Sequence, residues 1–241
     1  MRDLLRSEVL RSVSGLAMLG IASFVILIPA LMVNVGPPLE GLRAIDDALA
    51  TRTVFGLIAS SAIVAMYLGS YSVSREYYYG SMARSLVMAS TRRVFISKTL
   101  ASVIASLALC VVGIAIWSIV TVVLLRSFGR EPLFDGPFWR IVWGSLFASA
   151  CGGAIGVAVG WLVRNYYAAS GIVLLLPLMI EAPLLFNLPE VERYLPVGAI
   201  AGLAALPLDG LLPWWASGLV LLGWSVAATA AAALVVRRRE H

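Results

Sequence analysis

The stretch TLASVIASLALCVVGIAIWSIVTVVLL, residues 99–125, contains no charged side chain and decides the fold class. An apolar helix needs roughly 20 residues to cross the hydrocarbon core of a bilayer. Four more stretches lack Asp, Glu, Lys and Arg, and a further one is interrupted only by Glu181. The sequence therefore predicts an all-α polytopic membrane protein, a single domain over 1–241 with six transmembrane helices at about 13–35, 53–74, 99–125, 141–163, 167–187 and 213–236.

The charged residues predict how the helices are oriented. Hydrophobic residues make up 61% of the chain and charged residues only 13%, with a net charge of +5. Six spans bring both termini to one side. The termini and the loops on that side hold twelve Lys and Arg residues, and the loops on the other side hold six. Basic loops stay inside, so we expect a multi-pass protein of the cell membrane with both termini in the cytoplasm. The arginine-rich, lysine-poor composition favours a bacterial source.

Two shorter elements accompany the spans. Residues 1–12 alternate leucines with arginines, which is typical of an amphipathic helix that lies in the membrane interface. Residues 197–206 form a second apolar run between Pro196 and Pro207, too short to span the bilayer. We expect this run to be a short re-entrant or surface helix between the fifth and sixth spans.

Small residues recur every fourth position in the fourth span. In lipid, helices associate through close backbone approach, and small residues at this spacing mark a packing seam. The pattern predicts a helix–helix contact, with a partner helix in this chain or in another, along Gly144, Ala148, Gly152, Gly156 and Gly160.

Glu181 is the one acid within the fifth span. A carboxylate at membrane depth costs roughly 2.5–3.5 kcal/mol by insertion scales and points to a polar pathway. Glu181 lies about 21 Å along the helix from its inner end, at 1.5 Å per residue. There the carboxylate can reach outer water, so the structural interpretation is favoured over a role in proton coupling or substrate passage.

The inner loop at 75–98 is the only one long enough to hold an element of its own. Tyr78, Met82 and Leu86 recur at helical spacing and predict an apolar helical face. Ser90 or Thr91 is a plausible N-cap for the third span. A tyrosine-rich amphipathic helix suits two uses equally, resting on lipid or docking a soluble partner.

The same loop resembles the signature of ABC type-2 exporter permeases. In that family an Arg-Glu or Thr-Glu pair closes the second span and a Gly-Thr or Gly-Ser follows. A Leu-rich turn, a basic pair and a Lys opening the third span come next. The matching residues here are Arg75, Glu76, Gly80, Ser81, Leu86, Arg92, Arg93 and Lys98. The proline that the family often has near Ser90 is absent from this chain.

The resemblance implies a cytoplasmic coupling helix between spans 2 and 3 that sits in a cleft of a separate ABC ATPase subunit. Its contacts would come from Arg75, Glu76, Tyr79, Gly80, Ser81 and Arg84. A second permease copy, identical or different, is implied as a further partner beside membrane lipid, and ATP and Mg²⁺ are expected on the ATPase. The implied function is ATP-driven export of a hydrophobic or amphipathic substrate.

Several function classes are excluded by what the chain lacks. It has no phosphate-binding loop and a single lysine, Lys98, so we expect no nucleotide site, cofactor or enzyme activity of its own. The only histidine, His241, is the last residue, which leaves no His-metal or Ser-His site. The basic C-terminus anchors headgroups rather than nucleic acid. Two alternatives remain open: a six-span substrate-binding subunit, and a non-transporting scaffold or immunity protein.

Overall fold

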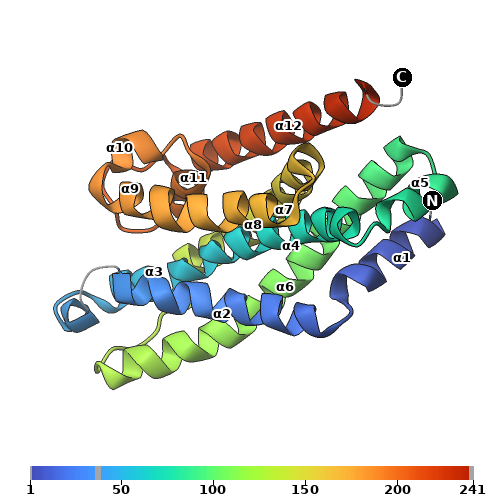
Figure 1. Cartoon of the computed structure of the whole chain (residues 1–241). Coiled ribbons are helices and arrows are strands. Elements are labelled where there is room, and N and C mark those ends of the chain that lie inside the picture. The colour runs from blue at the N-terminus through green and yellow to red at the C-terminus, as the bar shows by residue number, and fades with distance from the viewer. Residues whose placement is uncertain (1, 36–38, 239–241) are drawn as a thin grey trace.

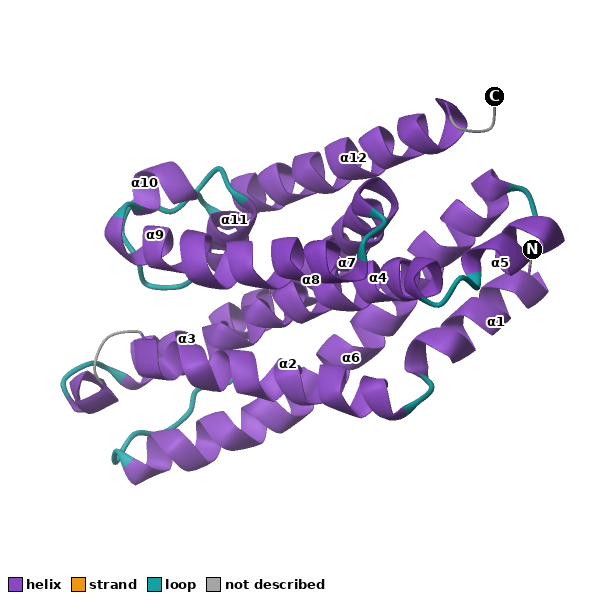
Figure 2. Cartoon of the chain, in the orientation of Figure 1, coloured by secondary structure: helices purple, strands orange, loops and turns teal. Residues whose placement is uncertain are grey.

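The computed structural model describes residues 2–35 and 39–238, and these residues form helices joined by short loops, with no strand (Figures 1 and 2). The elements are α1 (Arg2–Val13), α2 (Leu16–Val35), η1 (Leu39–Arg43), α3 (Asp47–Phe55), η2 (Gly56–Ser60), α4 (Ser61–Tyr78), α5 (Met82–Met88), α6 (Thr91–Ser127), α7 (Gly136–Val163), α8 (Tyr166–Leu175), η3 (Leu176–Glu181), α9 (Ala182–Asn187), α10 (Pro189–Glu192), α11 (Pro196–Leu203) and α12 (Trp214–Arg238).

Six helical stretches are long and apolar enough to cross a membrane, which confirms the predicted number of spans and indicates a multi-pass membrane protein. Their bounds are Leu16–Asn34, Asp47–Tyr78, Thr91–Ser127, Gly136–Val163, Tyr166–Asn187 and Trp214–Arg238. The second stretch starts six residues earlier than predicted. Its start is fixed by Asp46, whose side chain accepts a hydrogen bond from the backbone N–H of Leu49.

The chain has two distinct ends, as Figure 1 shows. One end holds α1, α5 and the last turn of α12, and we call it the terminal end. The opposite end holds η1, α9 and α10, and we call it the distal end. Both predicted short elements are helical: α1 packs against α6, and α11 is a short buried helix before α12.

The second and fourth spans form the centre of the bundle. In the most apolar stretch of these two spans, 78% and 61% of the residues are buried within the chain, against 22–33% in the other four spans. The predicted glycine seam is the reason that α7 can sit against α4. A methyl group at Gly152 or Gly156 would overlap the backbone of Ala62 or Met66 on α4, and Gly160 approaches Ser70 and Val73 in the same way.

The seam therefore lies between helices of this chain, and the end of it meets a different element. At Gly144 an added methyl group would overlap the carbonyl of Leu203, the last residue of α11. The glycine row thus holds both α4 and the short α11 against α7. Close approach also brings polar groups together, since Ser102 Oγ donates to the Gly153 carbonyl at 3.1 Å.

Candidate functional site

A buried lysine organises the terminal end of the bundle. The Lys98 side chain, on the first turns of α6, is 1% exposed. Its Nζ donates to Glu8 Oε2 on α1 at 2.8 Å and to Glu76 Oε1 on α4 at 2.7 Å. Burying an ammonium group without partners would be very costly, so these two carboxylates are what make the position tolerable.

Arg11 completes the charge balance. Its Nη1 lies 3.5 Å from Glu8 Oε1 and 3.7 Å from Glu76 Oε1. Two acids and two bases thus meet where α1, α4 and α6 come together, and we call Glu8, Arg11, Glu76 and Lys98 the lysine cluster. Removing one member would leave an uncompensated charge inside the chain.

The short helix α5 is attached to the lysine cluster. Tyr79, Gly80 and Ser81 turn the chain between α4 and α5, and Gly80 has a φ of +68°, which favours glycine. Ser85 Oγ on α5 then donates to Glu76 Oε2 at 3.2 Å. Met82 is the buried anchor of α5, packed with Val94 and Phe95 of α6. A displacement of α5 would therefore act on both α4 and α6.

The inner loop at 75–98 was predicted to carry one amphipathic helix with its apolar face along Tyr78, Met82 and Leu86, and this prediction is wrong in its geometry. The turn at Gly80 splits it, so the apolar face expected from Tyr78, Met82 and Leu86 is not continuous. Met82 is buried, whereas Tyr78 is 56% exposed. Helix α6 begins at Thr91 with Ser90 as its N-cap, but Ser90 makes no side-chain capping bond.

A hollow of about 420 Å³ opens beside the lysine cluster, between α1, the end of α4 and α5. Five of the six residues predicted to contact a partner line it, and Gly80 does not. The α1 side of the hollow is formed by residues that were not predicted as site residues. Together the lining is Leu4, Ser7, Glu8, Arg11, Arg75, Glu76, Tyr79, Ser81, Arg84, Ser85 and Met88.

The predicted contact residues differ in accessibility. Glu76 is 5% exposed and its carboxylate is held by Lys98 and Ser85, so its role in this structure is internal. Arg84 is exposed, and Tyr79 is 73% exposed. The most exposed apolar side chains of α5, Val87 at 88% and Met88 at 81%, were not among the predicted contacts. The free surface here is the tip of α5 together with Tyr79.

An aromatic layer flanks the site on the α8 side. The Arg75 guanidinium lies 4.9 Å from the centre of the Tyr71 ring. Tyr78 has its ring centre 5.7 Å from that of Tyr166 and 5.9 Å from that of Tyr167. Through these rings α4 also contacts the start of α8, so four helices converge on the terminal end near α5.

Glu181, predicted to reach outer water, is 3% exposed, and that expectation is wrong. Its Oε2 accepts a hydrogen bond from the Val197 backbone N–H at 2.9 Å, at the start of α11. The supporting segment η3 has π-helical winding between Pro177 and Pro183, where proline removes backbone donors. Glu181 is thus buried in the interior and caps the first turn of α11.

A second carboxylate, Glu192, lies beside Glu181 and is fully buried. Its Oε1 accepts from the Gly198 backbone N–H at 3.3 Å. Burial, together with the neighbouring Glu181 carboxylate, raises the pKa of Glu192 to about 8. The buried Oε2 of Glu192 meets no donor among the described residues, and a proton shared with Glu181 would satisfy it. We call Glu181 and Glu192 the carboxylate pair.

The sequence contained signals for the residues that were missed. Lys98 is a lone lysine at the edge of an apolar span and had to find an acid. Glu8 is one of the few acids near that end, but its burial could not be inferred from a helix expected to lie on lipid. For Glu192 no local signal exists, since Glu190 has the same residue type two positions earlier and is exposed.

Among the described residues no group of three or more His, Cys, Asp and Glu could hold a metal ion, and His241 lies outside the described part of the chain. Comparison of the chain with protein-family models and with curated proteins gives no match.

Proposed function

We propose that this chain is the membrane-spanning permease subunit of an ATP-driven exporter of the ABC type-2 kind, with the terminal end facing the cytoplasm. The observation that carries the proposal is α5, a short helix with an exposed apolar tip that is tied through Ser85 and Glu76 to the lysine cluster. The signature residues at 75–98 and the excess of basic residues in the same segments support it.

The length of α6 supports a role for α5 at the membrane surface. A helix of 37 residues is roughly 55 Å long, whereas a bilayer with its headgroups is about 40–45 Å thick. The first turn of α6 carries Arg92 and Arg93, which belong at or beyond the headgroups. Helix α5 precedes this turn, where a soluble partner can reach it.

The mechanism follows from these connections. ATP closes a pair of ATPase subunits, and their movement displaces α5. The Ser85–Glu76–Lys98 bonds pass the displacement to α1, α4 and α6, and α4 carries it to α7 along the glycine seam. Two such bundles then open a path for a hydrophobic or amphipathic substrate. The sequence has no phosphate-binding loop motif, and in this proposal ATP and Mg²⁺ act on the partner.

The test is co-purification with the ABC ATPase encoded nearest to this chain's gene, in lipid nanodiscs, with ATP turnover as the second readout. Val87→Asp places a charge on the tip of α5 and should reduce ATPase retention by about tenfold or more. Leu133→Asp is the control, because Leu133 is an exposed apolar residue at the distal end. Glu76 is unsuitable as a probe, since replacing it breaks the lysine cluster.

Equal retention in both variants would show that α5 is not the docking surface. A complex whose ATP turnover is unaffected by this chain would favour a scaffold or immunity protein. Stabilisation by a substrate with no ATPase bound would favour a substrate-binding subunit.

A further inference from the structure

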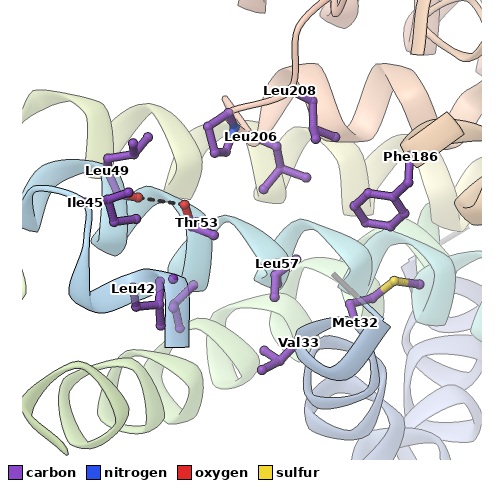
Figure 3. A pocket seen from close by; sticks show the side chains of 13 residues that line it. Met32, Val33, Leu42, Ile45, Leu49, Thr53, Leu57, Phe186, Leu206 and Leu208 are labelled. Atoms are coloured by element: carbon purple, nitrogen blue, oxygen red, sulfur yellow. Dashed lines mark hydrogen bonds between the residues drawn. The ribbon is translucent and has the colours of Figure 1, made fainter. Parts of the chain in front are cut away.

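An apolar cavity of about 280 Å³ opens at the distal end (Figure 3). Side chains from α2, η1, α3, η2, α9 and the turn after α11 enclose it. Figure 3 shows them pointing inward from several sides, among them Met32, Val33, Leu42, Leu57, Phe186 and Leu208. The cavity has almost no polar lining, which suits hydrocarbon rather than water.

A second cavity of about 600 Å³ adjoins the first and has a different lining. One wall belongs to both, because the two cavities share the side chains of Leu49, Leu206, Pro207 and Leu208. The second cavity adds two arginines, Arg52 and Arg140, and its rim includes Trp214. An apolar space and a basic space therefore lie next to each other.

Among the side chains that the structure describes, neither arginine has an ionic partner. The ion pair recorded at this end joins Arg130 to Asp47, at 3.5 Å. The Nε of Arg52 is buried and has no hydrogen-bond partner among the described residues. Arg140 is exposed at the start of α7. Two cations that face one cavity without a counter-charge complement an anionic group from outside the chain.

The two cavities lie at the depths that a lipid molecule needs. Trp214 donates its indole N–H to the Arg140 carbonyl at 3.3 Å, near the beginning of α12. Tryptophan in such a position is typical of the headgroup level. Leu57 lies five residues further into the span than Arg52, or roughly 7.5 Å at 1.5 Å per residue. The apolar cavity thus runs from Leu42 in η1 to Leu57, further into the span than Arg52, and the basic cavity includes the tryptophan.

We propose that these cavities form a binding site for one anionic phospholipid from the membrane leaflet at the distal end. The phosphate group binds Arg52 and Arg140, and part of an acyl chain fills the apolar cavity. The occupant is a resident lipid that fastens η1 and the turn after α11 to the bundle. The site is independent of the proposed ATPase partner and of membrane orientation, so either proposal can fail without the other.

The experiment is native mass spectrometry of the full chain released from detergent with equal amounts of phosphatidylglycerol and phosphatidylcholine of the same acyl chains. The wild type should retain one phosphatidylglycerol in preference to phosphatidylcholine. Arg52→Gln with Arg140→Gln should reduce that preference by about tenfold or more. The matched control is Arg43→Gln with Arg126→Gln, which removes the same charge at the same end but outside the cavities.

A second variant tests the acyl chain and guards against misfolding. Val33→Trp fills the apolar cavity without changing charge and should also abolish lipid retention, while the variant stays monodisperse on size exclusion. Equal retention of both lipids by the wild type, or equal loss in the two arginine double variants, would overturn the site. Full phosphatidylglycerol retention by Val33→Trp would overturn it as well, because the two cavities would then not hold one molecule.

Discussion

Both ends of this molecule bury two carboxylates, but they neutralise them in opposite ways. At the terminal end Glu8 and Glu76 share the ammonium group of Lys98, with Arg11 beside them. At the distal end Glu181 and Glu192 face each other and accept hydrogen bonds from the backbone of α11. The terminal end holds opposite charges together. At the distal end two carboxylates lie side by side, and a proton on one of them removes the repulsion between them.

The difference bears on what each end can do. Ionic contacts at the terminal end join side chains from α1, α4 and α6, so those helices are braced against one another beside α5. The distal contacts join η3 and α10 to the start of α11, and their strength follows the protonation of Glu192. The terminal end is suited to transmit displacement, and the distal end to hold a short buried helix in place.

Lys98→Met should produce the largest effect. The variant leaves Glu8 and Glu76 buried without the ammonium group, and breaking a buried ion pair in this way costs roughly 3–5 kcal/mol. The measurement is thermal unfolding in detergent, followed by the loss of near-UV circular dichroism. The control Arg126→Met removes an exposed base with no ion pair among the described residues, and should cost about 0.5 kcal/mol or less.

Stability can be recovered without the charges. The triple variant Glu8→Gln, Lys98→Met, Glu76→Gln should regain much of the loss, since neutral groups carry a smaller burial penalty. Equal melting of Lys98→Met and Arg126→Met would refute the idea that the lysine cluster braces the terminal end.

The membrane fold could be read from the sequence because it depends on patterns within single segments. Charge-free stretches such as 99–125 predicted the six spans, and the row from Gly144 to Gly160 predicted the seam. The seam's partner could not be predicted, because a small-residue face fits any helix. That α4 fills it follows from the assembled bundle.

The candidate site could be predicted only as a segment. The resemblance at 75–98 singled out residues that do line one hollow, but their orientation depended on two facts outside that segment. Gly80 ends the helix instead of continuing it, and Glu8 comes from α1 to meet Lys98. Glu181 was expected in water because of its depth along the fifth span. Depth does not reveal which neighbouring element covers a side chain, and here α11 covers Glu181.

A pH-dependent stability should separate the distal end from the terminal end. Glu192 has an ordinary pKa of 4.5 and a folded pKa of about 8. The unfolded chain releases this proton above pH 4.5, whereas the folded chain keeps it until about pH 8. Stability from this group is therefore complete below pH 4.5 and is lost progressively as the pH rises to about 8, by at most about 1.4 kcal/mol per pH unit.

Glu192→Gln should flatten the dependence of stability on pH, because an amide does not titrate. The amide can still accept the hydrogen bond from Gly198 and can donate one to Glu181. Unfolding temperatures measured from pH 5 to 8 give the slope. Glu190→Gln is the matched control, since Glu190 is exposed two residues earlier and the variant should keep the wild-type slope. Identical slopes in the wild type and Glu192→Gln would mean that the carboxylate pair does not share a proton.

Gly80→Ala should have the smallest effect on stability and the most selective effect on α5. The φ of +68° costs an L-residue roughly 1–2 kcal/mol, and a methyl group at this position meets no other atom. The strain is relieved by turning α5 away from the hollow, which lengthens the Ser85–Glu76 bond.

The control is Gly223→Ala, in α12, where no atom lies near the new methyl group. This variant should stabilise the chain by up to about 1 kcal/mol. Hydrogen exchange of the backbone amides distinguishes the two variants. Faster exchange along α5 in Gly80→Ala, with the amides around the lysine cluster still protected, would mean that the turn orients α5. Unchanged exchange would mean that Met82 and Ser85 alone orient it.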